Sequence, residues 1–172
     1  YAAAVLADAQ GDPVEAKQLL ETCLALRRAL QDTEGMAITL STLSVSCLAA
    51  GRIDAALQAE HEALPLMRQL GHRIGEAIGL QHLAHITLHQ GRRGEARVYN
   101  LQALELARQL KNLELEGECE WLLAEIAHAD GDSADAQARL RRSLQVCREA
   151  GDRSGEARAL GSLGRHALEQ YD

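Results

Sequence analysis

The sequence predicts an all-α solenoid of antiparallel helix hairpins, and three observations support this prediction. Glycine returns every 40 residues, at positions 11, 51, 91 and 131. The residues around it return in the same register, and no segment has the alternating β-branched pattern of a strand. Periods of roughly 20 to 50 residues are typical of solenoids, in which each unit buries its apolar face on its neighbours. We therefore expect one elongated array over residues 1–172.

Several residue types keep a fixed distance from each glycine. Small and apolar residues return before and after it, and an arginine follows near the end of each unit. They are Ala16, Ala56, Ala96 and Ala136; Leu24, Leu64, Leu104 and Leu144; Arg28, Arg68, Arg108 and Arg148; and Leu43, Leu83 and Leu123, each followed by a small residue.

Each unit contains two predicted helices. In the clearest unit, apolar residues between Ile74 and Gln90 return at spacings of three and four, which places them on one helical stripe. Gly91 then ends the helix. The same frame predicts nine helices: first helices at about 1–10, 33–50, 73–90, 113–130 and 153–170, and second helices at about 12–31, 52–70, 92–110 and 132–150. Because the links are only two or three residues long, neighbouring helices should run antiparallel. The units are about 1–32, 33–72, 73–112 and 113–152, with a final helix at 153–170.

Local signals support these boundaries, with one exception. Asp12 before Pro13 is a good N-cap with proline in the first helical position, and Asp132 offers a similar start. Pro65 lies inside a second helix, where proline removes a backbone hydrogen bond. We expect a kink there.

The composition and charge of the chain disfavour nucleic-acid-binding and membrane-spanning proteins. The net charge of −7 disfavours a phosphate-binding surface, so we expect no direct contact with nucleic acid and a basic or neutral partner. The four cysteines show no CxxC spacing and suit small buried hydrophobes in the reducing cytoplasm. No apolar run approaches the roughly 20 residues of a membrane span. The chain begins at Tyr1 inside a helix-like segment, so we expect it to be part of a longer protein.

The recurring pattern resembles the tetratricopeptide repeat. Leu83-Ala84, Gly91, Ala96 and Ala103-Leu104 show it in full, and it extends over almost the whole chain. The resemblance implies a right-handed superhelix whose concave surface, lined by the first helices, binds proteins or peptides. The units are six residues longer than that family's usual 34, as in bacterial multidomain regulators and in peptide-sensing and cargo-binding scaffolds. HEAT-like repeats share the period but do not predict the Leu-small and Ala placements.

The fourth unit departs from the others. Positions that are often aromatic in the family carry Leu40, Leu80 and Leu160, but Glu120 in the fourth unit. Tyr171 stands where the last unit should have glycine.

Projection of the first helices nominates a groove surface, to within about one helical position. These candidate partner-binding residues lie opposite the leucine stripe. They are Ser41, Val45, Leu48, Gln81, His82, His85, Leu88, His89, Glu118, Trp121, Leu122, Glu125, His128, Arg158, Ser162 and Arg165. In this hypothesis Trp121 and Leu88 supply apolar contact, and Arg158 and Arg165 receive acidic groups of the partner. Gln81, His82, His85 and Glu125 orient the partner through hydrogen bonds.

The histidines form the sharpest local feature of this surface. His82, His85 and His89 share one helical face, and Glu125 and His128 lie on the next first helix. Imidazole and carboxylate groups can bind zinc, and clustered histidines can respond to pH. A groove wall that hydrogen-bonds a peptide or water explains the same residues, so we assign neither a metal nor a cofactor.

Two further features each have two interpretations. Trp121, the only tryptophan, is either a partner anchor or a core residue that replaces the missing aromatics. The recurring arginines are either an anion-binding ladder or cations at helix C-termini that pair with Glu76, Glu116 and Glu156 across the link.

No nucleophile or cofactor signature is present: the sequence has no GxxxxGK[ST], no GxSxG and no HExxH. We therefore expect a non-catalytic scaffold that captures a peptide or partner helix in its concave groove. A ligand- or peptide-sensing module of a bacterial regulator is an alternative. Self-association through the array ends is another, because terminal units of solenoids normally need a polar cap.

Overall fold

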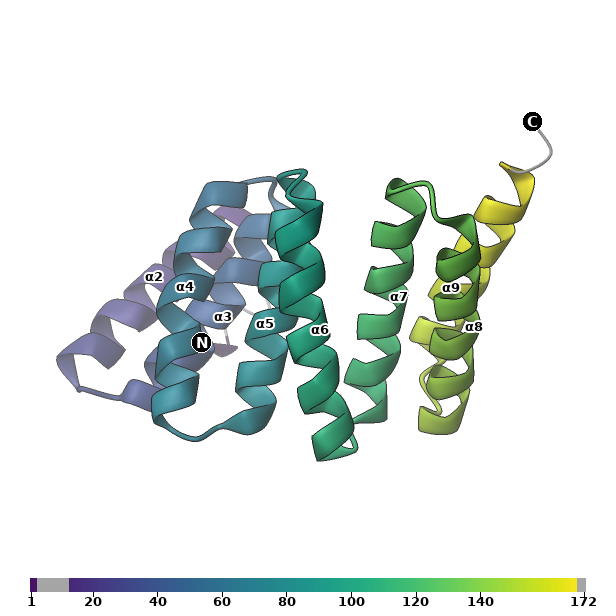
Figure 1. The fold of residues 1–172 in the computed structure, drawn as a ribbon. Coiled ribbons are helices and arrows are strands. Elements are labelled where there is room, and N and C mark those ends of the chain that lie inside the picture. Colours follow the sequence, from purple (N-terminus) through teal and green to yellow (C-terminus); the bar gives the residue numbers. More distant parts are fainter. Residues whose placement is uncertain (3–12, 170–172) are drawn as a thin grey trace.

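The computed structural model describes residues 1–2 and 13–169, and in these ranges the chain is helical without strands (Figure 1). The all-α prediction is confirmed. The described helices are α2 (Pro13–Ala29), α3 (Thr33–Ala49), α4 (Ile53–Gln69), α5 (Arg73–His89), α6 (Arg93–Leu110), α7 (Leu113–Ala129), α8 (Ser133–Ala150) and α9 (Arg153–Leu168). Each bound lies within two residues of the sequence prediction. Residues 3–10 of the first helix expected at 1–10, the Asp12 cap and Tyr171 lie outside the residues described.

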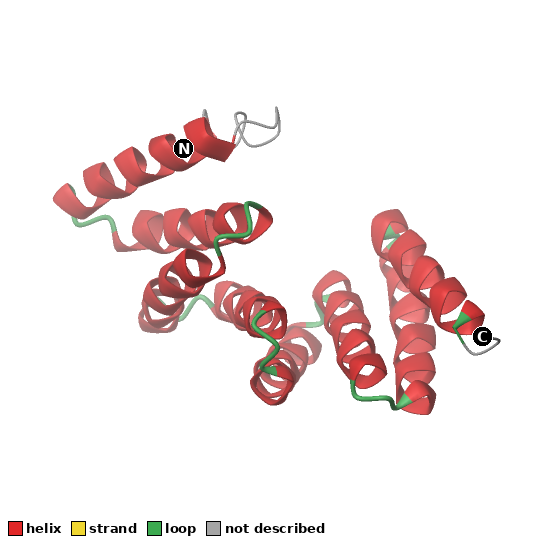
Figure 2. Ribbon diagram, turned by 90° about the horizontal axis from the view of Figure 1, so that it is seen from above, coloured by secondary structure: helices red, strands yellow, loops and turns green. Residues whose placement is uncertain are grey.

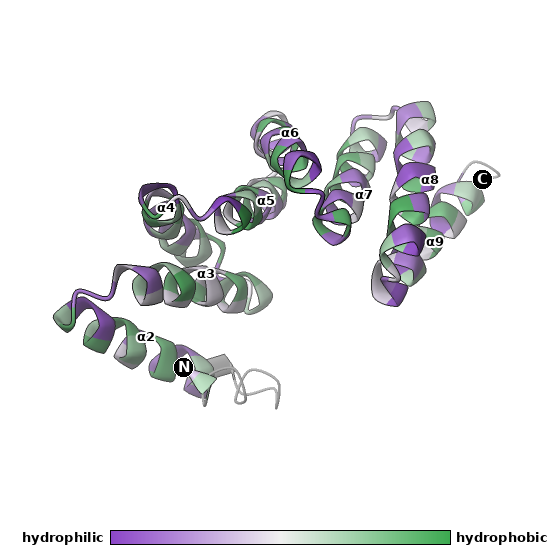
Figure 3. Ribbon diagram, turned by 90° about the horizontal axis from the view of Figure 1, so that it is seen from below, coloured by the Kyte–Doolittle hydropathy of each residue, from purple (hydrophilic) through white to green (hydrophobic). Residues whose placement is uncertain are grey.

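Consecutive helices form antiparallel hairpins that stack side by side. Each hairpin pairs a first helix with a second helix, as in α3 with α4, α5 with α6, and α7 with α8 (Figure 2). The first helices also contact one another along the array, since α3 meets α5, α5 meets α7, and α7 meets α9. The array follows a curved path, with α4, α6 and α8 on its outer side (Figure 3). The first helices therefore line the inner side.

Helix starts are fixed by side chains that accept a hydrogen bond from the first helical turn. At five of the described starts an Asp, Asn or His side chain accepts a backbone N–H two or three residues on: Asp32, His72, Asn112, Asp132 and Asp152. Such a cap satisfies one of the donors left unpaired at a helix N-terminus. The expected cap at Asp132 is confirmed.

Helix ends show a second and shorter period in the backbone. Every described link has one residue with positive φ, and these residues fall 20 apart, at 31, 51, 71, 91, 111, 131 and 151. Five of them are glycine, which adopts this conformation without steric cost. Gln31 and Lys111 adopt it as well, at φ 54° and 55°. The 40-residue glycine period is thus part of a 20-residue backbone period.

Small side chains fill the seams between helices. The recurring alanines Ala16, Ala56, Ala96 and Ala136 are fully buried, as are Ala77, Ala84 and Ala124 on first helices. Leucines complete the core, with Leu80 and Leu83 at 2% and 1% exposure. Without large side chains at these positions, helix axes can approach closely.

Glu120 gives the fourth unit a different core. The equivalent residues Leu40 and Leu80 are 2% exposed, and Glu120 is buried to a similar degree, at 4%. Its two oxygens accept hydrogen bonds from Arg108 Nη2 at 2.6 Å and from Arg139 Nη1 at 3.2 Å. Because an unpaired buried carboxylate is strongly unfavourable, these two arginines make the substitution tolerable.

The recurring arginines are structural. Three of them hold the glutamate that begins the following helix: Arg68 with Glu76 at 2.8 Å, Arg108 with Glu116 at 3.3 Å, and Arg148 with Glu156 at 2.7 Å. The predicted pairing across the link is confirmed. Arg28 differs because Met36 occupies the corresponding position, and it binds Glu62 at 2.6 Å instead.

Helix α4 continues through Pro65. The helix ends only at Gln69, four residues later. Proline there does not terminate the helix, and the expected kink stays a prediction.

The cysteines are free thiols among apolar neighbours. Cys47, Cys119 and Cys147 are buried and Cys23 is half-buried. Burial raises the pKa of the Cys47, Cys119 and Cys147 thiols. They therefore act as small hydrophobes, as expected. In the part of the chain that is described, no helix is long and apolar enough to cross a membrane.

Candidate functional site

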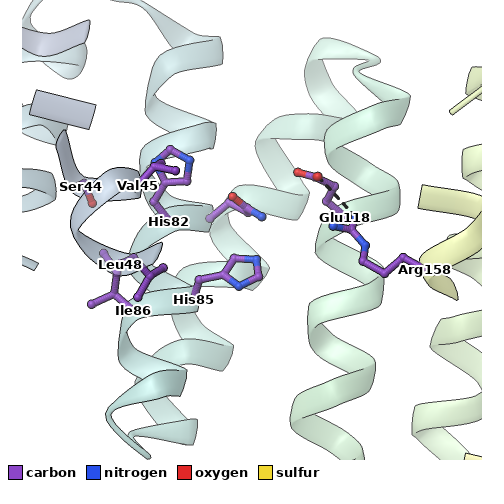
Figure 4. A pocket seen from close by; sticks show the side chains of 9 residues that line it. Ser44, Val45, Leu48, His82, His85, Ile86, Glu118 and Arg158 are labelled. Carbon is purple, nitrogen blue, oxygen red and sulfur yellow. Dashed lines mark hydrogen bonds and ion pairs between the residues drawn. The ribbon is translucent and has the colours of Figure 1, made fainter. Parts of the chain in front are cut away.

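A pocket of about 240 Å³ opens on the inner side of the array. It lies between α3 and α5 on one side and α7 and α9 on the other (Figure 4). Its lining residues are Ser44, Val45, Leu48, Gln81, His82, His85, Ile86, Glu118 and Arg158. We call this the concave pocket. It joins side chains from four helices that are far apart in sequence, from Ser44 on α3 to Arg158 on α9.

One wall of the concave pocket is apolar. Val45 and Leu48 project from α3, and Ile86 from α5 lies beside them (Figure 4). Val45 is 45% exposed, so its side chain is accessible from the pocket. Ser44 is fixed from behind, since its hydroxyl donates to the Ala56 carbonyl at 3.0 Å. This wall offers contact to an aliphatic group.

His82 is held by partners within the protein. Its Nδ1 lies 3.1 Å from a carboxylate oxygen of Glu60 and 3.3 Å from the Ser41 hydroxyl. Glu60 belongs to α4 but is only 1% exposed, at a position that carries Leu20 and Leu140 in two other units. The Glu60 carboxylate therefore fixes the His82 ring at the edge of the pocket.

His85 and Arg158, which both line the pocket, contact the same aromatic ring, that of Trp121. The His85 ring lies 6.0 Å from the Trp121 ring, at 26°, and the Arg158 guanidinium lies 4.6 Å from the Trp121 centroid. Burial, with smaller contributions from His82, Arg158 and His89, lowers the pKa of His85 from 6.5 to about 4. His85 is consequently neutral at physiological pH.

Trp121 packs beside the concave pocket, against two of its lining residues, His85 and Arg158. Its indole N–H donates to the Ser162 hydroxyl at 3.1 Å, and with Leu88 it packs on a buried cluster that includes Leu122. Trp121 is half-buried. The core role is thus confirmed and the role as a partner anchor stays a prediction, and a Trp121→Ala change would remove core contacts along with any contact to a partner.

Gln81 is the unusual polar residue of the pocket. It is 6% exposed, yet it lines the cavity. The side-chain amide of Gln81 makes no hydrogen bond with any of the described residues. Its amide atoms are not among the buried polar atoms without a partner, so they are open to the cavity, and Gln81 has a donor and an acceptor available to a molecule in the pocket.

A second, acidic hollow continues from the first. Glu118 lines both, and the second is completed by Ile78, Asn112, Glu114, Leu115 and Asp152, with a volume of about 330 Å³. Arg158 Nη2 lies 3.4 Å from Glu118 (Figure 4). We call this hollow the acidic pocket, because three of its six residues are carboxylates.

The end of the array near α9 has its own polar cluster. Glu125 accepts from Ser162 at 2.8 Å and binds Arg165 through both of its oxygens, at 2.8 and 2.7 Å. The rings of His128 and His166 stack at 3.8 Å. Burial and the His128 ring lower the pKa of His166.

The structure divides the nominated residues into two groups. Seven line the concave pocket: Val45, Leu48, Gln81, His82, His85, Glu118 and Arg158. The others lie around it, with His89 exposed, Leu122 buried in the core and Leu88 packed against it. Ser162 is 4% exposed; its hydroxyl accepts a hydrogen bond from Trp121 and donates one to Glu125. Arg165 forms an ion pair with Glu125. Arg158 and Arg165 each face a carboxylate of this chain, Glu118 and Glu125 respectively, and their binding of acidic groups of a partner stays a prediction.

Four residues that line or support the two pockets are not predicted from the sequence: Glu60, Ile86, Glu114 and Asp152. Glu60 is not singled out, although this position is Leu20 and Leu140 in two units and polar in the other two, as Glu60 and Asn100. Glu114, Asp152 and Ile86 are also omitted from the predicted groove, since Ile86 lies one position outside the projected face. A comparison of equivalent buried positions on the second helices, unit by unit, would identify Glu60 from the sequence.

Over residues 1–2 and 13–169, no group of three His, Cys, Asp or Glu side chains is placed to hold a metal ion. His82 is bound by Glu60, His85 stacks on Trp121, and His89 is exposed. His128 lies with His166 and Glu169. The shared helical face therefore does not bring the imidazoles to one point.

Comparison with known proteins supports the repeat assignment. A sequence model of the tetratricopeptide repeat matches residues 1–69. No curated protein matches the chain by sequence. Among solved structures, BtubC (BKLC) from P. vanneervenii is similar, with 20% identity and a TM-score of 0.73 over 98% of this chain and 78% of that one.

A second similar fold is found in the nearly identical TPR-like repeats of a Podosopora anserina protein described as a kinesin light chain. It has 16% identity and a TM-score of 0.69 over 98% of this chain and 87% of that one. At this identity the similarity shows the fold. The chain is a helical-repeat array with the fold of tetratricopeptide-repeat proteins, and its first 69 residues match that family's sequence pattern.

Proposed function

We propose that the chain is a non-catalytic protein-interaction module that captures an extended peptide segment of a partner in the concave pocket. The main support for this proposal is the pocket, which four inner helices form around the exposed Val45 and the Gln81 amide. Among the described residues, this amide makes no hydrogen bond. An apolar wall with a few oriented polar groups is the usual composition of a binding site. The free thiols suit a reducing compartment, and a cytoplasmic location is part of the same proposal.

Two other functions use different surfaces or different ligands. A sensor in a larger regulator would bind a small molecule in the concave pocket and change the curvature of the array. Self-association would use the apolar side of α9, where Leu160 is 46% and Leu168 is 72% exposed. Light scattering at increasing concentration distinguishes self-association, because mass should then rise with concentration.

Peptide display tests the proposal with a matched pair of variants. Val45 and Val98 are both exposed helical valines, at 45% and 54%, but Val45 lines the concave pocket and Val98 lies on the outer helix α6. Peptides selected from a random library are measured by fluorescence anisotropy against both variants. We expect Val45→Asn, which removes apolar contact without adding charge, to weaken binding about tenfold, as for a central contact residue, and Val98→Asn to leave it unchanged. Equal affinities for the two variants would contradict the proposal, as would failure to select any peptide.

A further inference from the structure

We propose that the concave and acidic pockets together select a peptide in which an aliphatic side chain lies within a few residues of a lysine or arginine. This inference rests on the proposed function and adds the chemical class of the partner. The two pockets adjoin at Glu118, which lines both.

The concave pocket accounts for the aliphatic side chain and for the peptide backbone. Val45, Leu48 and Ile86 offer apolar contact. The Gln81 amide, 6% exposed and without a hydrogen bond among the described residues, can both donate to and accept from a peptide unit. Its position in the cavity wall orients an extended backbone beside the apolar wall.

The acidic pocket accounts for the cation. Glu114, Glu118 and Asp152 place three carboxylates around it, and Arg158 is the arginine of the combined lining. His85 adds no positive charge at neutral pH, since its pKa lies at about 4. Arg158 Nη2 faces Glu118, its guanidinium lies over the Trp121 ring, and its Nε is buried. Glu118 is paired with this arginine and Asp152 caps α9, but three carboxylates against one arginine leave an excess of negative charge, which complements a lysine or arginine side chain.

An acidic peptide fits this surface poorly. Arg158 and Arg165 could attract it, but each already faces a carboxylate, Glu118 and Glu125 respectively. The net charge of −7 also disfavours the approach of an anionic segment. Charge complementarity thus selects one class of partner.

The test uses an array of synthetic peptides with a fixed aliphatic residue. Lysine, glutamate or glutamine is placed one, two or three positions after it, because successive residues of an extended peptide advance about 3.3 Å. We expect at least one lysine peptide to bind more tightly than its glutamate and glutamine counterparts. Its binding should weaken as salt is raised, because exposed charges are screened.

A charge reversal with a matched control completes the test. Glu114 and Glu34 are the second residues of α7 and α3, exposed and equivalent in the repeat, but Glu114 lines the acidic pocket and Glu34 does not. Glu114→Lys should weaken the lysine peptide about three- to tenfold, and Glu34→Lys should not. If binding requires Val45 but is equal for lysine and glutamate peptides, this inference fails and the proposed function stands. If no peptide depends on Val45, both fail.

Discussion

At the scale of single residues, the inner surface is organised by contacts one repeat apart. Ser41 meets His82, Trp121 meets Ser162, and Glu125 meets Arg165, and each pair is separated by 40 or 41 residues. Because stacked units place equivalent positions side by side, polar groups on the first helices satisfy one another along the array. Within the described residues the Gln81 amide is an exception, and for this reason it marks the pocket.

His85 should make stability depend on pH. Its pKa is about 4 when folded and 6.5 as a free group, so below pH 6.5 the unfolded chain binds a proton that the folded chain does not. The free energy of unfolding should fall as pH decreases through this window. Between about pH 7 and 5 the His85 contribution is about 1–2 kcal/mol. His85→Gln should reduce this slope, measured by urea unfolding at several pH values.

The exposed His61 on α4 supplies the control for this measurement. His61→Gln should keep the slope of the unsubstituted chain. If the change of unfolding free energy with pH is identical with and without His85, its burial does not contribute to the pH dependence of stability.

At the scale of helices and links, the backbone at each turn determines where an element ends. The link residues have positive φ at every twentieth position, whether the residue is Gly91 or Lys111. A side chain at such a position is strained, because its Cβ approaches the following carbonyl. Glycine at this site therefore has a different role from glycine inside a helix.

Two glycines three residues apart test this difference. Gly91 has φ +75°, whereas Gly94 lies in α6, and a Cβ added to either would meet no atom within 4 Å. Gly91→Ala should lower the free energy of unfolding by about 1 kcal/mol through backbone strain alone. Gly94→Ala should raise it by about 0.5 kcal/mol, because alanine favours helix. Thermal unfolding of the two variants gives the comparison, and destabilisation by both would contradict this explanation.

At the scale of the whole molecule, the period predicts most of the architecture. The 40-residue frame predicts the helix bounds within two residues, the buried alanines, and the Arg68–Glu76 type of pair across links. These features are local or repeat from unit to unit, so spacing alone determines them.

The partners of the inner residues are harder to predict. Helical projection nominates Ser162 and Arg165 as available to a partner, but another first helix occupies them through Glu125. Such contacts depend on how closely successive hairpins stack, which projection of a single helix does not include. Glu120 shows the same limit, because Arg139, 19 residues later on another helix, makes its burial acceptable.

Nuclear magnetic resonance tests the central claim, peptide capture on the inner surface, most directly. The side-chain amide of Gln81 lines the concave pocket, the indole N–H of Trp121, the only tryptophan, belongs to a ring that contacts the lining residues His85 and Arg158, and the exposed Gln102 amide reports on α6. During titration with the tightest lysine peptide, we expect the Gln81 and Trp121 signals to move and the Gln102 signal to stay in place. Movement of Gln102 with unchanged Gln81 and Trp121 signals would place the peptide on the outer helices and contradict the account.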